Sequence, residues 1–178
     1  MGRNKMLLDV DGAPMVRRAV LVAREAGLAP IVVVVGNDAA RVRDALDGLE
    51  CTFAVNPDFT GPTSGSLHAG LHALPDAVDA TVILLADMIR VTTPMLAALL
   101  QANRIGDAPL GVSRYGDVLA PPLLFRRALW PELLAWHGEG CGKAVVKAHQ
   151  HEAAMHDWPG AALRDVDTPD DYRELVAQ

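Results

Sequence analysis

The sequence predicts an α/β fold in which helices cover both faces of a mostly parallel sheet, giving three layers. Two observations indicate this. Short β-branched segments alternate along the chain with longer segments in which apolar residues recur at helical spacing. Residues 31–36 and 80–86 are apolar at nearly every position, as is typical of strands buried on both faces of a parallel sheet. Strands that alternate with helices form βαβ units with right-handed crossovers.

The individual elements follow in order. Residues 5–10 form a short apolar segment that ends in a tight turn at Asp11 and Gly12. Pro14 suits the first turn of a helix that Gly27 ends, over residues 14–27. The other expected strands are 31–36, 51–55, 80–86, 108–113 and 152–158. The other expected helices are 37–48, 64–74, 93–103, 125–136, 142–149 and 168–178.

Composition excludes several classes of protein. The chain has 178 residues, a length that suits one domain, and its formal net charge is −6. Basic residues never run longer than two, so a nucleic-acid partner is not expected. The apolar segments are too short to cross a membrane or to serve as a signal peptide. Cys51 and Cys141 make no disulfide framework, which favours a cytoplasmic protein.

An acidic residue, Asp87, directly follows the apolar segment 80–86. In open α/β sheets, ligands bind beyond the carboxyl ends of the strands. A carboxylate there is a hard oxygen ligand of the kind that Mg²⁺ prefers. Position alone supports a metal ligand and an ordinary cap or loop residue equally.

A second acidic group lies near the C-terminus, in "RDVDTPDDY". Asp165 and Asp167 are two residues apart, so in an extended segment they point the same way, and one or both would share a metal with Asp87. The alternative is that Asp167 or Thr168 caps a helix that begins at Pro169. Taken alone, the motif favours the cap.

The most distinctive stretch is "NPDFTGPTSGSLHAGL". Asn56 ends a strand, and a Gly/Pro/Thr/Ser loop leads into a helix that opens with Ser64, Gly65 and Ser66. Free N–H groups and hydroxyls at a helix start suit a base edge or a phosphate, whereas Ser64 as a plain N-cap is the alternative. Gly65 and Gly70 weaken a helix relative to Ala, which indicates close approach by a ligand or a packed helix.

The chain opens with a small basic loop, "MGRNK". Lys5 immediately precedes an apolar segment, which places it at the rim of the sheet. A lone lysine near a terminus is ordinarily a solvated charge. Its place at the sheet rim makes Lys5 the remaining candidate site residue.

Together these stretches resemble the MobA-like nucleotidyltransferases, particularly the molybdenum-cofactor cytidylyltransferases. That family opens with a strand, a loop of the form LAAGxSxRMGxxK, a Leu-rich segment and GxP, and this chain has "MGRNKMLLDVDGAP". The family's base-binding stretch resembles "NPDFTGPTSGSLHAGL", its metal-bearing "GDMP" resembles "ADMI" at 86–89, and its C-terminal acidic motif resembles "DVDTPDD" at 165–171. The four motifs occur in the family's order over nearly the whole chain.

The resemblance implies a Rossmann-like α/β/α fold of the nucleotide-diphospho-sugar transferase type. It implies transfer of CMP from CTP to a phosphorylated acceptor, molybdopterin, with release of pyrophosphate. CTP is favoured over GTP because "TSGSL" is more like the serine-rich loop of the cytidylyl enzymes. The implied catalytic residues are Lys5 and Asp87. The implied nucleotide-binding residues are Gly2, Arg3, Lys5, Asn56, Ser64, Gly65 and Ser66. The implied Mg²⁺ ligands are Asp87, Asp165 and Asp167.

The chain also departs from the family pattern. Ala86 and Ile89 replace Gly and Pro beside the metal Asp, and "LAPPLLF" replaces "GNPVLF" at 119–125. The first strand and LAAGxSxR have no counterpart, so we expect residues 1–178 to be a single, N-terminally shortened domain. The strand would lie between segments 31–36 and 80–86. The chain would then pair those segments directly, fill the gap with residues 5–10 or a partner's strand, or fold poorly.

Two alternative functions stay open. One is an enzyme of the same fold that transfers a nucleotide from CTP or GTP to a sugar phosphate or another phospho-acceptor. The other is a non-catalytic remnant that binds a nucleotide or a partner. A molybdoenzyme or a second copy of the chain is the macromolecular partner that the resemblance suggests.

Overall fold

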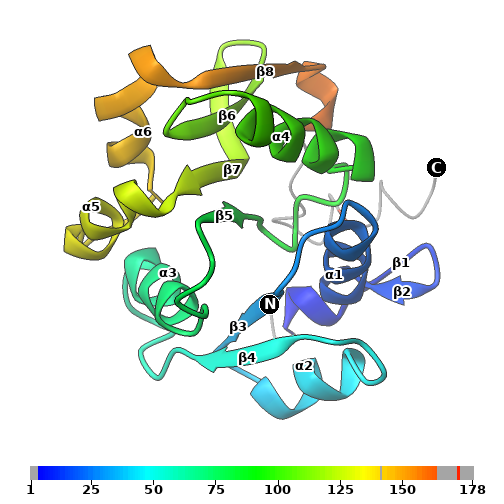
Figure 1. The fold of residues 1–178 in the computed structure, drawn as a ribbon. Coiled ribbons are helices and arrows are strands. Elements are labelled where there is room, and N and C mark those ends of the chain that lie inside the picture. Colours follow the sequence, from blue (N-terminus) through cyan, green and yellow to red (C-terminus); the bar gives the residue numbers. More distant parts are fainter. Residues whose placement is uncertain (1–3, 141, 164–171, 173–178) are drawn as a thin grey trace.

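The computed structural model of the chain describes residues 4–140, 142–163 and 172 (Figure 1). Its helices are α1 Met15–Glu25, α2 Ala39–Ala45, α3 Thr63–His72, α4 Thr93–Ile105, α5 Trp130–Ala135 and α6 Lys143–His149. Its strands are β1 Asp9–Val10, β2 Ala13–Pro14, β3 Val32–Val35, β4 Thr52–Val55, β5 Ala80–Ile83, β6 Leu110–Tyr115, β7 Val118–Arg126 and β8 Ala154–Trp158. Short 3₁₀ turns are η1 Lys5–Leu7, η2 Arg127–Leu129, η3 Gln150–Glu152 and η4 Gly160–Ala162.

The larger sheet has the strand order β5-β7-β6-β8. Strand β7 runs antiparallel to both β5 and β6, while β6 and β8 are parallel. Strands β5, β6 and β8 therefore share one direction, and β7 is reversed. The expected α/β class is confirmed. The expected helix over 168–178 lies almost wholly outside the described residues.

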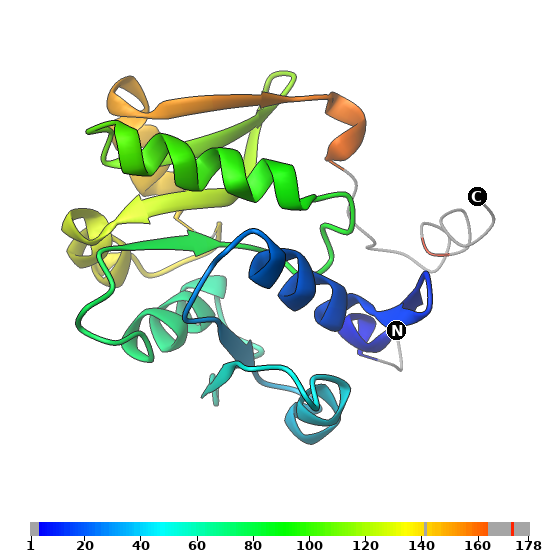
Figure 2. The same cartoon turned by 45° about the vertical axis from the view of Figure 1, so that its right-hand side comes forward.

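Two hydrophobic cores hold helices against the two faces of this sheet (Figures 1 and 2). Alternate residues of β7 point to opposite faces, because side chains alternate along a strand. One core joins α3, α5 and α6 to the sheet and contains Leu71, Phe125, Leu133 and Val146. The other joins α1 and α4 to the opposite face and contains Ala23, Leu99 and Leu124. The three-layer arrangement follows from this alternation.

Strand β7 is the element that the sequence did not reveal. Residues 119–125 contain Pro121 and Pro122, and proline lacks the N–H group that a strand needs. The structure places this pair where the β6–β7 register shifts, between Val112 and Ser113. The Ser113 hydroxyl donates to the Pro122 carbonyl at 2.8 Å, and a tyrosine hydroxyl, from Tyr115, donates to the Pro121 carbonyl at 2.9 Å. The expected helix over 125–136 is correct only for its second half.

We expect Ser113→Ala to lower the free energy of unfolding by about 1–3 kcal/mol, because it removes a buried hydrogen bond to the Pro122 carbonyl. Denaturant unfolding measures this. The control Thr93→Ala removes a hydroxyl whose bond to Glu25 is exposed, and it should change stability by less than about 0.5 kcal/mol. Equal losses in both variants would contradict the assigned role.

Strands β3 and β4 form a separate parallel pair. Among the described residues, β3 pairs with no strand but β4, and β5 with no strand but β7, so each has one unpaired edge. Residues 5–10 do not fill the position between β3 and β5, because they form η1 and then the first strand of the β1–β2 hairpin. Asp11 and Gly12 take positive φ in that hairpin, which confirms the predicted tight turn.

Helices α1 and α3 each contact both sheets, from opposite sides. On one side, Val16 and Val20 of α1 pack with Val35 of β3, while α1 also reaches the core over the larger sheet through Ala23. On the other side, α3 packs closely on β3. A Cβ at Gly70 would lie 3.1 Å from Val34 Cγ2, so the close approach inferred from this glycine is to a strand.

Among the described residues, no helix combines the length and the apolar character that crossing a bilayer requires.

An exposed cluster of His149, Glu132 and Glu152 joins α6 to α5. The hydrogen bond with Glu132 raises the pKa of His149 above its ordinary value, and Glu152 adds to the effect. Because folding raises this pKa, the stabilisation is complete below the unfolded-state pKa of about 6.5 and is lost as the pH rises through the folded-state pKa.

Glu132→Gln should therefore lower the melting temperature at about pH 5.5 and have little effect at about pH 9. Thermal unfolding across this range measures the difference. Glu50→Gln, the same change at an exposed position outside the cluster, is the control. A loss for Glu132→Gln that is independent of pH would contradict the linkage.

Candidate functional site

The centre of the candidate site is an ion pair. Lys5 Nζ lies 2.6 Å from Asp87 Oδ2, and the two side chains are 33% and 15% exposed. Asp87 lies in a turn that follows β5, and the strand ends at Ile83 rather than at residue 86 as expected. The backbone turns there, and the Ile89 N–H donates to the Asp87 carbonyl at 3.0 Å. The structure thus brings together the two residues predicted to be catalytic.

Asn4 fixes the position of Lys5. Its side-chain oxygen accepts from the Met6 N–H at 3.1 Å and so caps η1. Its amide nitrogen donates to the Asn37 carbonyl, just beyond β3, at 3.2 Å. The Lys5–Asp87 pair then ties this point to the chain beyond β5. The carboxyl ends of β3 and β5 therefore converge on one place.

Asn56 adds the end of β4 to the same edge. Its backbone N–H donates to the Val35 carbonyl at 2.8 Å, at the last residue of β3. Its side chain is 5% exposed and contacts the chain on both sides. The amide nitrogen donates to Ser66 Oγ at 3.0 Å, and the amide oxygen accepts from the Asp58 N–H at 3.0 Å. Asn56 thus joins β4, the following loop and the first turn of α3.

The first N–H groups of α3 are capped from another part of the chain. Pro62 precedes the helix and supplies no side-chain cap. The Ser64 N–H donates to the Gly138 carbonyl at 3.1 Å, and the Gly138 N–H donates to Ser64 Oγ at 3.1 Å. The Thr63 N–H donates to Glu139 Oε2 at 3.3 Å. Ser64 is buried, and its hydroxyl is engaged by this loop.

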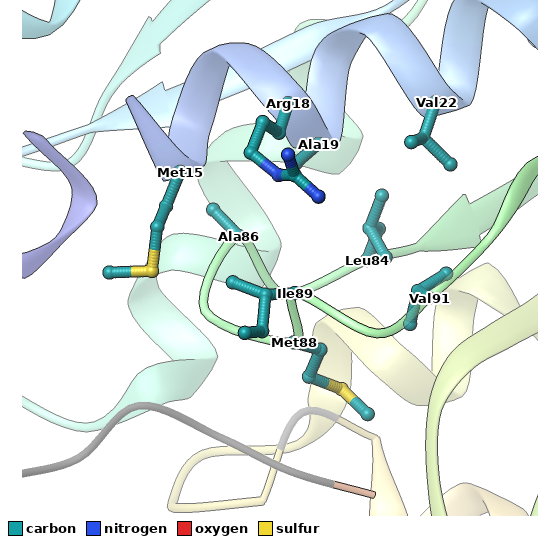
Figure 3. Close-up of a pocket in the computed structure, with 9 residues that line it drawn as sticks. All are labelled: Met15, Arg18, Ala19, Val22, Leu84, Ala86, Met88, Ile89 and Val91. Atoms are coloured by element: carbon teal, nitrogen blue, oxygen red, sulfur yellow. The ribbon is translucent and has the colours of Figure 1, made fainter. Parts of the chain in front are cut away.

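A small pocket lies beside Asp87, between α1 and the chain that follows β5 (Figure 3). Ala86, Met88 and Ile89 form one side, and Arg18 from α1 forms part of the other. Its volume is about 20 Å³, which holds about one water molecule and is too small for a nucleotide. The Nε atom of Arg18 is buried here with no hydrogen-bond partner among the described residues.

The other predicted site residues divide into two groups. Asn56, Gly65 and Ser66 lie together, since a Cβ at Gly65 would be 3.3 Å from the Asn56 amide nitrogen. Gly2, Arg3, Asp165 and Asp167 lie outside the described residues. Within the part of the chain that is described, no three His, Cys, Asp or Glu side chains gather in a way that would hold a metal.

Sequence reasoning missed the loop at 138–140 and the structural role of Asn4. The loop belongs to "HGEGCGK", whose three glycines all take positive φ. That glycine spacing is the signal that would have drawn attention to it. Asn4 carried no signal beyond the preference of Asn for caps.

The fold and the site together define the class of protein to which this chain belongs. This is an open α/β domain with a charged site where the carboxyl ends of several strands meet, the arrangement that binds nucleotides in many unrelated proteins.

The domain family described as the MobA-like NTP transferase domain matches residues 1–154. The chain belongs to this family and carries a nucleotidyltransferase domain. The bifunctional protein GlmU of Cupriavidus pinatubonensis is 34% identical over 110 residues, which cover 61% of this chain. The match spans only 23% of that protein's length.

Solved structures of one mycobacterial protein are similar over the whole fold. Rv0371c from Mycobacterium tuberculosis H37Rv has 26% sequence identity and a TM-score of 0.88, covering 100% of this chain and 91% of its own. Its complex with manganese has 27% identity and a TM-score of 0.82, covering 99% of this chain and 94% of its own.

Proposed function

We propose that this protein transfers a nucleotidyl group from a nucleoside triphosphate to a phosphorylated small molecule and releases pyrophosphate. The Lys5–Asp87 pair carries the proposal, because it sets a cation and a carboxylate side by side where three strand ends converge. CTP is the proposed donor and molybdopterin the proposed acceptor, on the resemblance of the motifs. The proposed location is the cytoplasm.

The reaction needs positioning and charge stabilisation more than covalent help from the protein. A phosphate oxygen of the acceptor attacks the α-phosphorus of the triphosphate. The bond from that phosphorus to the bridging oxygen breaks, and pyrophosphate leaves with the electron pair. Lys5 would contact the leaving phosphates, and its partly exposed side chain leaves it accessible to them. Gly2 and Arg3 are proposed to complete the phosphate contacts.

The site suits a divalent cation. Asp87 offers a hard carboxylate oxygen of the kind that Mg²⁺ prefers, and it already faces the ammonium group of Lys5. Asp165 and Asp167 are the further ligands that we propose. When bound, Mg²⁺ would neutralise triphosphate charge. The manganese complex of Rv0371c supports a divalent metal in relatives of this chain.

The start of α3 is the proposed site of base recognition, through Ser64, Gly65 and Ser66 with Asn56 in support. Ser66 is the more accessible of the two serines, since Ser64 is buried against Gly138. A sugar phosphate or another phospho-acceptor is the alternative acceptor. A molybdoenzyme or a second copy of the chain is the proposed macromolecular partner.

The test is to incubate the protein with CTP or GTP, with Mg²⁺ or Mn²⁺, and with either molybdopterin or a panel of sugar phosphates. Pyrophosphate release and product mass identify the donor and the acceptor. We expect turnover with CTP and a metal-dependent rate. Nucleotide binding without pyrophosphate release under all conditions would support the non-catalytic alternative instead.

A further inference from the structure

We infer that Asn56 is a positioning residue that makes the Ser66 hydroxyl a hydrogen-bond donor toward the nucleotide. The group recognised at this point is then an acceptor, such as a carbonyl oxygen of the base. The inference deepens the proposed function and rests on it. It follows from three observations on the first turn of α3.

The first observation fixes which way the Asn56 amide points. The Asp58 backbone N–H lies 3.0 Å from one end of the amide. A backbone N–H only donates, so that end must be the carbonyl oxygen. The other end, which lies 3.0 Å from Ser66 Oγ, is therefore the NH₂ group. Because the side chain is buried, water does not compete for either bond.

The second observation concerns the hydrogen of the Ser66 hydroxyl. An amide NH₂ only donates, so Ser66 Oγ accepts this bond and cannot give its own hydrogen to Asn56. No described residue provides an acceptor for that hydrogen. Ser66 as a whole residue is only partly buried. Its hydroxyl is left to donate to whatever binds there.

The third observation is the fit of Gly65 against the same amide. A Cβ at this position would lie 3.3 Å from the Asn56 amide nitrogen and 3.5 Å from its oxygen. A larger residue would press on the amide that sets the polarity of Ser66. The glycine thus preserves the Asn56–Ser66 geometry, which gives a physical reason for a helix-weakening residue in the first turn.

The decisive variant is Asn56→Asp, which keeps the shape of the side chain, replaces the donating NH₂ group with an accepting oxygen and adds a negative charge. Its carboxylate accepts from both the Asp58 N–H and the Ser66 hydroxyl, so the Ser66 hydrogen turns inward. We expect CTP affinity, measured by calorimetric titration with MgCl₂, to fall about tenfold, as for Ser66→Ala. Asn103→Asp is the matched control, because the Asn103 oxygen already accepts from Arg126 Nε and an aspartate keeps that bond.

Combining Asn56→Asp with Ser66→Ala distinguishes the reversed Ser66 hydroxyl from the added negative charge as the cause of lost affinity. If Asn56→Asp acts through Ser66, adding Ser66→Ala to it costs no further affinity. If the new negative charge repels the triphosphate directly, the two losses multiply to about 100-fold. Multiplied losses, or wild-type affinity in Asn56→Asp, would overturn the inference.

Melting temperatures test the hydrogen bond without any ligand. Asn56→Ala and Ser66→Ala should each lower the melting temperature, and the double variant should lose no more than Asn56→Ala alone. Additive losses would show that the bond does not exist. If the wild-type protein binds neither CTP nor GTP, the proposed function is wrong, and so is the role of Ser66 in recognition. The melting temperatures would still show whether the Asn56–Ser66 hydrogen bond exists.

Discussion

Asp87→Asn is expected to reduce metal-dependent nucleotidyl transfer by about 10²–10³-fold while leaving the fold intact. The substitution keeps the shape of the side chain but removes the charge that pairs with Lys5 and would hold the cation. Lys5 is partly exposed, so water can solvate its ammonium group when the Asp87 carboxylate is replaced. Stability should therefore change far less than activity.

Steady-state pyrophosphate release and calorimetric titration of CTP, each with and without Mg²⁺, measure this effect. Asp76→Asn is the matched control, since it removes the same charge from a fully exposed carboxylate that pairs with Arg127. We expect the metal-dependent part of CTP affinity to disappear in Asp87→Asn and to persist in Asp76→Asn. Equal metal-dependent affinities in wild type and Asp87→Asn would exclude a metal-binding role for Asp87.

The second large effect is expected from adding a strand between β3 and β5. Each of these strands has one edge unpaired by any described strand, and α1 and α3 cover both sheets on opposite sides. Each additional hydrogen bond contributes about 0.5–1.5 kcal/mol, so several would add a few kcal/mol. We propose that residues 1–178 form a single domain and that the position between β3 and β5 accepts one further strand.

The test fuses an apolar strand and a loop of the form LAAGxSxR ahead of Met1. A gain of a few kcal/mol corresponds to a rise of about 10 °C in melting temperature for a chain of this size. The control fusion has the same length and composition but carries prolines at alternate strand positions, because proline cannot complete the hydrogen-bond ladder. CTP turnover should rise with the first fusion. Equal melting temperatures and rates in both fusions would show that no strand enters there.

The sequence determined the secondary structure wherever one local pattern dominated. The apolar periodicity of α1 and the β-branched run of β3 predicted those elements within a few residues. Asp11 and Gly12 predicted the β1–β2 turn, because few residues other than Gly, Asn and Asp adopt positive φ readily. Only the tertiary structure revealed β7. Its two prolines argue against a strand locally, and Ser113 and Tyr115 compensate for them from the neighbouring strand.

The same division holds for the site. The position of Asp87 after an apolar strand marked it as a candidate, because strand ends in such sheets are where ligands bind. The sequence did not show that Lys5 reaches it, since 82 positions separate the two residues and their pairing depends on how η1 sits beside β3. It also did not distinguish the two serines of α3. Ser64 is buried and bonds to Gly138, whereas Ser66 is partly buried and accepts a hydrogen bond from Asn56, so contacts distant in sequence distinguish the two.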